Sequence, residues 1–354
     1  MPRPGPRNLI TDVEGLLVGH AQDEAVASGV TALLCPDAWT AGVDVRGGGP
    51  GTREIDVLRP ENNFSKAHAI CLSGGSVFGL GAADGVVAAL SASGRGIRLA
   101  PTSPAIPIVP AAVLHDLGNG GDKDWGLDPP YRWLGIEAAA AADKDFALGS
   151  AGAGMGAMAG LAKGGIGSAS LELGDGLVVG ALAAVNPVGS VRMADGETFW
   201  AWPWEIDGEF GGKRPAPDAP TEAEPIPEDS KLAALGRLQA GANTTLAVVA
   251  VNADLTTAEC TRLAMMAQDG LARAIRPVHT PFDGDIVFAL ASCARSLGEG
   301  PGRALALARL GSAAADTLAR AIARGVYEAQ PSEARSSGAQ SSVSGGASGG
   351  ASAP

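Results

Sequence analysis

Residues 241–252 read GANTTLAVVAVN, and within this stretch the chain passes from a turn directly into an apolar run. Gly and Asn favour turns, whereas LAVVAV has the composition of a strand buried inside a sheet. The residues Thr256-Thr257-Ala258-Glu259 that follow match a capping box, the pattern that starts a helix. One face of that helix is apolar, at Leu263, Met266, Ala267 and Leu271. We therefore expect a buried strand at 246–251 followed by an amphipathic helix.

Strand-like and helical segments alternate along the rest of the chain. Further strands are expected at residues 30–35, 68–72, 177–185 and 285–291. Further helices are expected at residues 78–91, 135–142 and 303–326. Mixed elements of this kind predict an α+β or α/β domain built of packed layers.

Two segments differ in composition from the rest of the chain. Residues 207–230 are rich in Pro, Glu and Asp, which predicts a flexible surface linker. Residues 331–354 are rich in Ser, Gly and Ala, which predicts a disordered tail. We therefore expect a single domain over residues 1–330.

The composition argues against several classes of protein. Hydrophobic residues make up 46% of the 354 residues and charged residues only 18%, so a sizeable core can be buried. A net charge of −12 without a Lys/Arg cluster argues against nucleic acid as a partner. The four cysteines form no CxxC pair and no His lies at metal-ligand spacing, so we expect reduced structural thiols and no metal. No apolar run is long enough to cross a membrane and no signal peptide is present, which predicts a cytoplasmic protein.

Thr244, at the start of the predicted strand, can serve as a nucleophile if its backbone amine is free. An α-amine has an ordinary pKa of roughly 8 and can accept the hydroxyl proton near neutral pH. A free amine requires breakage of the Asn243–Thr244 bond. Attack of the Thr244 hydroxyl on the Asn243 carbonyl, followed by ester hydrolysis, would break it. Taken alone, however, Asn in a turn before a Thr-Thr strand start is an ordinary structural pattern.

GANTTLAVVAVN resembles the cleavage site of the DmpA-like peptidase family, the L-aminopeptidase/D-esterases, which include β-peptidyl aminopeptidases and nylon-oligomer hydrolases. The resemblance extends from about residue 11 to about residue 327. Its blocks are DVRGGGPGTRE (44–54), HAICLSGGSVFGLGAADGV (68–86), PIVPAAV (107–113), GAGMG (152–156), VNPVG (185–189) and GLARAIRPVHTPFDGDIVFAL (270–290). The resemblance implies an α+β fold, a layered αββα sandwich of two central sheets flanked by helices. It also implies self-cleavage into an α-chain, 1–243, and a β-chain whose core is 244–330.

The same resemblance assigns further residues of the site. Lys163, in LAKGGIG, matches a lysine near the nucleophile, where a cation would stabilise negative charge and lower the pKa of the α-amine. Asn186, in VNPVG, matches an asparagine whose amide can donate to the developing oxyanion. Asp283 and Asp285, in HTPFDGDIVF, match an acidic pair of the nylon-oligomer branch that would orient the amine and hydroxyl of Thr244. Without the resemblance, these residues are typical of a solvated lysine and of turns.

The implied reaction is hydrolysis of an amide, peptide or ester bond through an acyl-Thr244 intermediate, without a cofactor. His115, in AAVLHDL, lies where relatives carry an aromatic residue close to the substrate, so we expect it to line the substrate site. The substrate stays open among short peptides, D-amino acid esters or amides, β-peptides and 6-aminohexanoate oligomers. The Asn-Thr site and the acidic pair favour the nylon-oligomer type. The family also implies homo-oligomers of the two-chain unit, tetramers or larger.

Two other functions stay open on the sequence alone. The first is an acyltransferase of the ornithine-acetyltransferase kind, which shares the Thr nucleophile and self-cleavage but transfers the acyl group to an amine. The second is a non-catalytic protein on the same fold. A nucleotide site at GAGMGA (152–157) is disfavoured, because the segment before these glycines is predicted to be helical and not a strand. A metal site at His279 is disfavoured because no second histidine supports it.

Overall fold

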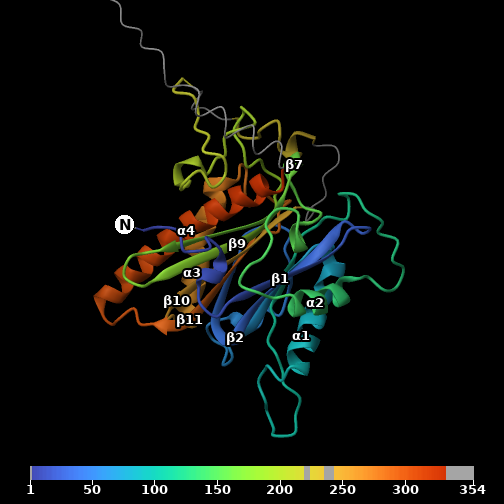
Figure 1. Cartoon of the computed structure of the whole chain (residues 1–354), viewed down its shortest axis with the longest axis vertical. Helices are drawn as coiled ribbons and strands as arrows, with labels where there is room; N and C mark the ends of the chain where they lie inside the picture. Colours follow the sequence, from blue (N-terminus) through green and yellow to red (C-terminus); the bar gives the residue numbers. More distant parts are fainter. Residues whose placement is uncertain (1, 219–223, 235–242, 332–354) are drawn as a thin grey trace, which may run out of the picture.

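The computed structural model describes residues 2–218, 224–234 and 243–331 of the chain (Figure 1). The α-helices in these residues are α1 (Ala82–Ala92), α2 (Tyr131–Ala140), α3 (Thr257–Ala274) and α4 (Pro301–Glu328). Short 3-10 helices occur at η1 (Ile10–Asp12), η2 (Ile55–Leu58), η3 (Ser76–Gly81), η4 (Gly152–Gly154), η5 (Trp202–Trp204) and η6 (Lys231–Ala234). None of the helices in the described ranges combines the length and the apolar composition that a membrane crossing requires.

The strands of the described residues form one nine-stranded sheet and a separate two-stranded hairpin. Along the large sheet the order is β3 (Gly51–Arg53), β5 (Ala111–Val113), β4 (Lys66–Ser73), β2 (Ser28–Val45), β11 (Ile286–Arg295), β10 (Thr244–Ala253), β9 (Val178–Asn186) and β8 (Gly165–Glu172). Beside this path, β1 (Leu17–Asp23) pairs with β2. The hairpin consists of β6 (Met158–Ala159) and β7 (Ala162–Lys163).

Strand β2 connects the two halves of the large sheet. Its first part, 28–34, pairs with β1 and β4, whereas its last part, 40–45, pairs with β11. The register with β4 shifts between Leu34 and Trp39, and such an irregularity allows a strand to bend. The two central sheets that the resemblance implies are therefore, in the described residues, two parts of one continuous sheet.

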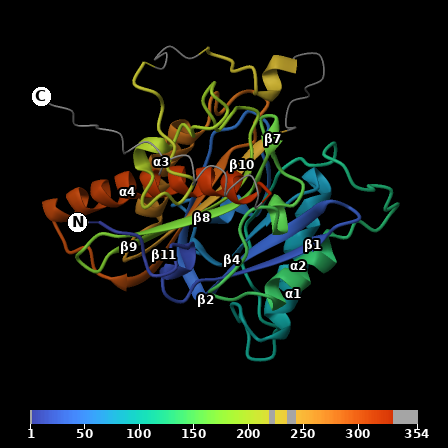
Figure 2. The same cartoon turned by 45° about the horizontal axis from the view of Figure 1, so that its top comes forward.

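The buried side chains divide into three clusters, which define four layers. The middle cluster lies between the two halves of the sheet and includes Leu33, Leu72, Leu182, Val248 and Phe288. The second cluster lies on the other face of β8 to β11, the face that points away from the middle cluster, and packs it against α3 and α4. The third packs β2 and β4 against α1 and α2. Figure 2 shows the resulting arrangement, with α3 and α4 on one side of the strands and α1 and α2 on the other.

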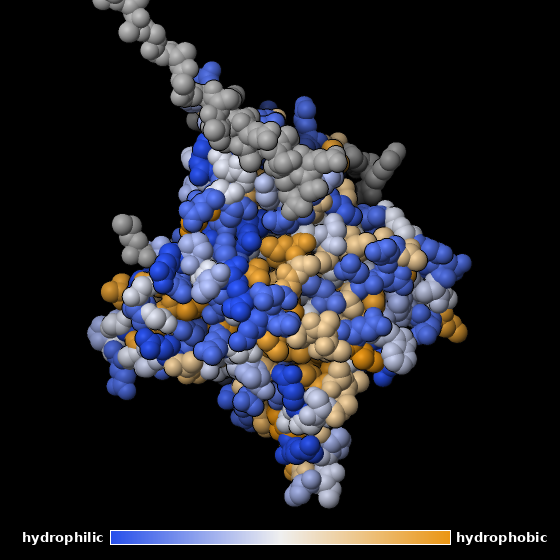
Figure 3. Space-filling model, viewed as in Figure 1, coloured by the Kyte–Doolittle hydropathy of each residue, from blue (hydrophilic) through white to orange (hydrophobic). Residues whose placement is uncertain are grey.

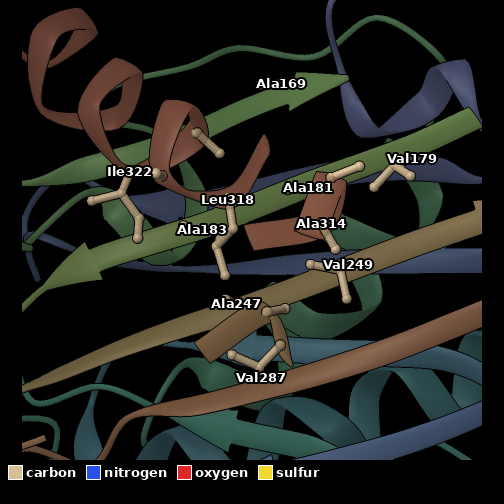
Figure 4. Close-up of a cluster of buried hydrophobic side chains, with 14 of the residues drawn as sticks. Ala169, Val179, Ala181, Ala183, Ala247, Val249, Val287, Ala314, Leu318 and Ile322 are labelled. Atoms are coloured by element: carbon tan, nitrogen blue, oxygen red, sulfur yellow. The ribbon is translucent and has the colours of Figure 1, made fainter. Parts of the chain in front are cut away.

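Small side chains allow α4 to pack very close to the sheet. Figure 4 shows Ala181, Ala183 and Ala247 from the strands facing Ala314, Leu318 and Ile322 of the helix. At the closest point, a Cβ added to Gly167 of β8 would lie 1.8 Å from the carbonyl oxygen of Ala321. Glycine at 167 is therefore required by the approach of the helix backbone.

The structure confirms the main secondary-structure predictions. The predicted strands correspond to β2, β4, β9, β10 and β11, and the predicted helices to α2, α3, α4 and η3 with α1. The capping box is present, since the Thr256 side chain accepts from the Glu259 N–H and the Glu259 carboxylate accepts from the Thr256 N–H. Strand β8, with the sequence GIGSASLE, was not expected, because its Gly and Ser residues hide the apolar pattern of a buried strand.

The described ends of segment 207–230 are packed onto the body of the protein. Phe210 is buried in the cluster beneath α4, and the Glu209 carboxylate accepts from the guanidinium of the buried Arg320 at 2.5 Å. At the other end, the Asp229 carbonyl accepts from the Leu161 N–H at 2.8 Å. Residues 219–223 and the predicted tail beyond 331 lie outside the described residues.

The surface mixes apolar and polar residues. Figure 3 shows apolar residues gathered near the centre of one face, with hydrophilic residues around them. Large exposed apolar side chains include Val77, Leu127 and Trp133. Exposed apolar side chains are common on folded proteins, so these three need no functional explanation.

Candidate active site

The Asn243–Thr244 bond lies inside the large sheet. Thr244 is the first residue of β10, which runs between β9 and β11. Antiparallel pairing places Asn186, the last residue of β9, directly opposite Thr244, and a parallel bridge places Asn243 beside Asp283. Asn243 and Thr244 are only 1% and 2% exposed. The strand order therefore gathers these residues at one buried point, although Asn186 and Asp283 are far apart in the sequence.

The carbonyl oxygen of Asn243 accepts two hydrogen bonds. The Thr244 Oγ1 hydroxyl donates to it at 2.5 Å, and the Gly284 N–H donates at 2.8 Å. Donors at a carbonyl oxygen stabilise the negative charge that develops there when a nucleophile attacks the carbon. The Thr244 hydroxyl thus lies against the carbonyl group that it would attack, in a polarised environment.

Gly284 is held close to Thr244 by the glycine-rich segment 47–49. The Gly49 N–H donates to the Asp283 carbonyl at 2.8 Å. A Cβ added to Gly284 would lie 2.6 Å from Thr244 Oγ1 and 2.8 Å from the Gly49 carbonyl oxygen. The DVRGGGPGTRE block therefore forms part of the wall around the nucleophile, and position 284 has no room for a side chain.

Asp283 is buried and bonded mainly to backbone groups near the site. Its carboxylate accepts from the Val188 N–H at 3.0 Å, the Thr280 N–H at 3.0 Å and the Thr280 hydroxyl at 2.6 Å. Burial raises the pKa of the Asp283 carboxyl to about 6, and the nearby charge of Asp285 adds to the shift. Asp283 therefore fixes the loop after β9 against the segment that carries Gly284.

Asp285 binds the backbone of Thr245, the residue that follows the nucleophile. Its Oδ1 accepts from the Thr245 N–H at 2.7 Å. Its Oδ2 accepts from the His279 N–H at 3.0 Å and lies 2.9 Å from His279 Nδ1. Asp285 thus fixes the backbone next to Thr244 and links it to the imidazole of His279, a residue to which no sequence motif assigns a role.

Asn186 connects the nucleophile region to the predicted substrate residue. Its Oδ1 accepts from the Met158 N–H at 2.9 Å, and its Nδ2 donates to the His115 carbonyl at 3.1 Å. Asn186 is fully buried, whereas His115 is partly exposed. The structure therefore places Asn186 and His115 together, opposite Thr244.

Two lysines flank this group, and they differ in burial and contacts. Lys163, the predicted site lysine, is exposed on β7, and its Nζ donates to the Met155 carbonyl at 3.0 Å. Lys231 donates from Nζ to Asn243 Oδ1 at 2.7 Å and to the Met158 carbonyl at 2.7 Å. Burial lowers the pKa of the Lys231 ammonium to about 7, and the charge of Asp283 opposes that shift.

Lys231 was not predicted from the sequence. Its only signal is a single lysine that follows the acidic stretch 222–229, twelve residues before Asn243. Gly241 and Ala242, the expected turn before the bond, lie outside the described residues. Among the described residues, no group of three or more His, Cys, Asp or Glu side chains could hold a metal ion.

Comparison with known proteins identifies relatives of the whole chain. The sequence matches the model of peptidase family S58 over residues 8–339. A protein of Mycobacterium tuberculosis (strain ATCC 25618 / H37Rv), named as an uncharacterized aminopeptidase, is 45% identical over 340 residues, which cover 92% of this chain and 95% of the relative. A 6-aminohexanoate-oligomer endohydrolase of Kocuria sp. (strain KY2) is 30% identical over 307 residues, which cover 84% of this chain and 79% of the relative.

Solved structures show the same architecture. A Burkholderia sp. beta-aminopeptidase superimposes with a TM-score of 0.65 at 26% identity, over 92% of this chain and 88% of that one. The L-aminopeptidase D-Ala-esterase/amidase of Ochrobactrum anthropi superimposes with a TM-score of 0.66 at 20% identity, over 93% of this chain and 88% of that one. The latter is described as a new variant among the Ntn hydrolase fold, and its likeness concerns the fold alone.

The protein is a hydrolytic enzyme, and its fold is the variant of the Ntn hydrolase fold seen in the Ochrobactrum anthropi protein. The two relatives above share its sequence over most of its length, and they are named as an aminopeptidase and as an oligomer endohydrolase. The chain belongs to peptidase family S58. The resemblance to the DmpA-like family is thereby confirmed.

Proposed function

We propose that this enzyme cuts its own chain between Asn243 and Thr244, and that the freed Thr244 then hydrolyses amide bonds of short peptides or amino-acid oligomers. The observation that carries this proposal is the position of Thr244 Oγ1, 2.5 Å from the Asn243 carbonyl oxygen, together with the Gly284 N–H that donates to the same oxygen. Peptidase family membership and the aminopeptidase and oligomer-hydrolase names of the relatives support amide bonds as the target.

The self-cleavage proceeds in two steps. Thr244 Oγ1 attacks the Asn243 carbonyl carbon, the carbon–nitrogen bond breaks, and the departing nitrogen takes a proton to become the Thr244 α-amine. The product is an ester between Asn243 and the Thr244 hydroxyl. Water then hydrolyses this ester, which leaves a carboxylate on Asn243 and a free Thr244 hydroxyl. The Gly284 N–H is placed to stabilise the oxyanion of the first step.

Substrate hydrolysis repeats this chemistry with an external amide. The free Thr244 amine accepts the hydroxyl proton as the hydroxyl attacks the substrate carbonyl. The amine of the substrate leaves, and water hydrolyses the acyl-Thr244 ester. Asp285 supports this cycle by fixing the Thr245 N–H, and Asn186 lies opposite the nucleophile with its amide anchored on both sides.

Intact-mass analysis of purified protein tests the proposal. The wild-type chain should give two products, residues 1–243 and residues 244–354. Thr244→Ala should remain whole because it lacks the hydroxyl, whereas Thr244→Ser should still be cut because the hydroxyl is retained. The wild-type protein should release amine from short peptide amides, and Thr244→Ala should be inactive.

The same measurement detects a competing chemistry. The Nδ2 group of Asn243 has no hydrogen-bond partner among the described residues. The nitrogen of an asparagine side chain can attack the backbone carbonyl carbon of the same residue, which breaks the peptide bond and forms a cyclic imide. That route would leave an α-chain lighter by one water and would operate in Thr244→Ala as well. Cleavage of Thr244→Ala would therefore refute the role of the hydroxyl, and a wild-type chain that stays whole would refute self-cleavage.

A further inference from the structure

Lys231 binds the side chain of Asn243, the residue whose carbonyl group would be transferred to Thr244 Oγ1 during self-cleavage. Its Nζ donates to Asn243 Oδ1 at 2.7 Å, while a second hydrogen bond, to the Met158 carbonyl, fixes the ammonium from the other side. Asn186 Oδ1 lies 3.5 Å away. A buried ammonium is stable only if its donors are satisfied, so the oxygen of Asn243 contributes directly to the stability of this site.

The position of Lys231 does not depend on the Asn243–Thr244 bond. Its backbone N–H donates to the Val188 carbonyl at 2.9 Å, and the neighbouring Asp229 accepts from the Leu161 N–H and from the Ser190 hydroxyl. All of these partners precede Asn243 in the chain and lie at or near the end of β9 and the β6–β7 hairpin. Lys231 should therefore keep its place after the cut.

The chemistry of the cut links this contact to substrate choice. The ester that forms between Asn243 and the Thr244 hydroxyl has a free α-amine beside it, so it has the same chemical structure as the acyl-enzyme of substrate hydrolysis. In that ester, Asn243 is the acyl residue. A substrate whose carbonyl takes the same position would direct its side chain toward Lys231 Nζ, which keeps the Met158 carbonyl but has one donor free once Asn243 withdraws after the cut.

We propose that Lys231 is a specificity-determining residue, which selects substrates whose acyl residue carries an amide oxygen where the precursor has Oδ1 of Asn243. The preferred acyl group is thus asparaginyl or a residue of the same side-chain chemistry. The Lys231 ammonium would also attract a carboxylate, but the charge of Asp283, which already acts on Lys231, would oppose a second carboxylate there and not a neutral amide. This inference rests on the proposed function, because it requires acyl transfer to Thr244.

The charge of Lys231 gives the inference a pH signature. Burial lowers the pKa of its ammonium to about 7, so the group is charged below that pH and increasingly neutral above it. The charged groups near it are Asp283, Asp229 on its own segment and Lys163 on the adjacent hairpin, joined after cleavage by the Thr244 amine and the new carboxylate of Asn243. A charged donor binds an amide oxygen more strongly than a neutral one. The preference for an amide side chain should therefore decrease as the pH rises through 7.

The experiment compares two substrates of nearly the same shape, the p-nitroanilides of asparagine and leucine, on the mature wild-type enzyme. We expect kcat/KM for the asparagine substrate to exceed that for the leucine substrate by roughly 10- to 100-fold, the range of a hydrogen bond to a charged group. Ionisations of the enzyme that change kcat/KM equally for both substrates cancel in the ratio of the two values. This ratio should fall as the pH rises through about 7, the pKa of the Lys231 ammonium.

Lys231→Met should lower the asparagine-to-leucine ratio by roughly 10-fold or more, with a smaller effect on the leucine substrate. Lys144→Met, which removes an exposed lysine elsewhere, is the matched control and should keep the wild-type ratio. If Lys231→Met is not cut, the ratio in the wild-type enzyme and its pH dependence decide the question. A mature enzyme without preference for asparagine, or with a ratio that does not change with pH, overturns the inference and leaves the proposed function intact. A chain that stays whole and hydrolyses neither substrate overturns both.

Discussion

At the residue scale, the decisive group after Thr244 is a glycine. Gly284 donates its N–H to the Asn243 carbonyl, and any side chain at this position would meet the nucleophile hydroxyl. We expect Gly284→Ala to abolish or strongly slow self-cleavage, because the added methyl would lie 2.6 Å from Thr244 Oγ1 and 2.8 Å from the Gly49 carbonyl oxygen. Alanine keeps its N–H, but the clash would shift that N–H away from the Asn243 carbonyl oxygen, and loss of an oxyanion donor typically slows acyl transfer by about 100- to 1,000-fold. The rate of precursor disappearance, followed by gel or mass spectrometry, measures this effect.

Gly302→Ala is the control for that substitution. Position 302 lies in the first turn of α4, and a Cβ added there meets no atom within 4 Å. Alanine also favours a helix more than glycine does, so this variant should be cut at the wild-type rate and be at least as stable. Normal cleavage of Gly284→Ala would show that the close approach of residue 284 to Thr244 is not needed for the reaction.

At the element scale, helix α3 depends on the cap that the sequence predicted. Thr256 Oγ1 accepts from the Glu259 N–H, and Glu259 also receives a charge-assisted contact of 2.7 Å from Arg303 of α4. The cap therefore joins the start of α3 to the start of α4, the two helices that cover β8 to β11. An N-cap that also contacts a neighbouring helix should affect the stability of the whole layer.

Thr256→Ala should lower the free energy of unfolding by about 1 kcal/mol, the usual effect of losing an N-cap side chain. Thr256→Ser keeps the oxygen acceptor and should differ from wild type by only a few tenths of a kcal/mol. Urea denaturation measures both changes. The substitutions are best made in a protein that also carries Thr244→Ala, because that protein should remain one covalent chain. Equal losses in the Ala and Ser variants would mean that the methyl group, and not the cap, is responsible.

At the scale of the whole molecule, the proposed cut passes through the middle of the large sheet. Strands β9 and β2 precede the cut, whereas β10 and β11 follow it, and β10 pairs with β9 while β11 pairs with β2. The middle cluster likewise contains residues from both sides of the cut, such as Leu182 and Val248. Separation of the two chains would expose this core and the edges of the strands.

We therefore expect the two products to remain together after cleavage. They should elute as one species in size-exclusion chromatography under native conditions and separate only in denaturant. The uncut Thr244→Ala protein provides the reference elution volume. Elution of residues 244–354 as a separate species without denaturant would contradict this expectation, since the fold would then not need both chains.

The site was only partly predictable from the sequence. Thr244, Asn186, Asp283 and Asp285 each belong to a recognisable motif, and the structure gathers them because β9, β10 and β11 are neighbours in the sheet. Lys163 matches its motif as well but is exposed, whereas the half-buried Lys231 belongs to no motif. The contact of Lys231 with Asn243 exists only because the segment around residue 229 docks at the end of β9, which no local pattern specifies.

The sequence by itself determined the local elements: the turn and strand around Thr244, the capped helix α3 and the long amphipathic helix α4. These follow from periodicity and capping, which act within a few residues of the chain. The tertiary structure alone decided that β2 joins both halves of one sheet, that Gly284 supplies a donor to the Asn243 carbonyl, and that a lysine is buried beside it. The physical reason is that burial and hydrogen-bond partners are set by strand order, which brings together residues that are far apart in the chain.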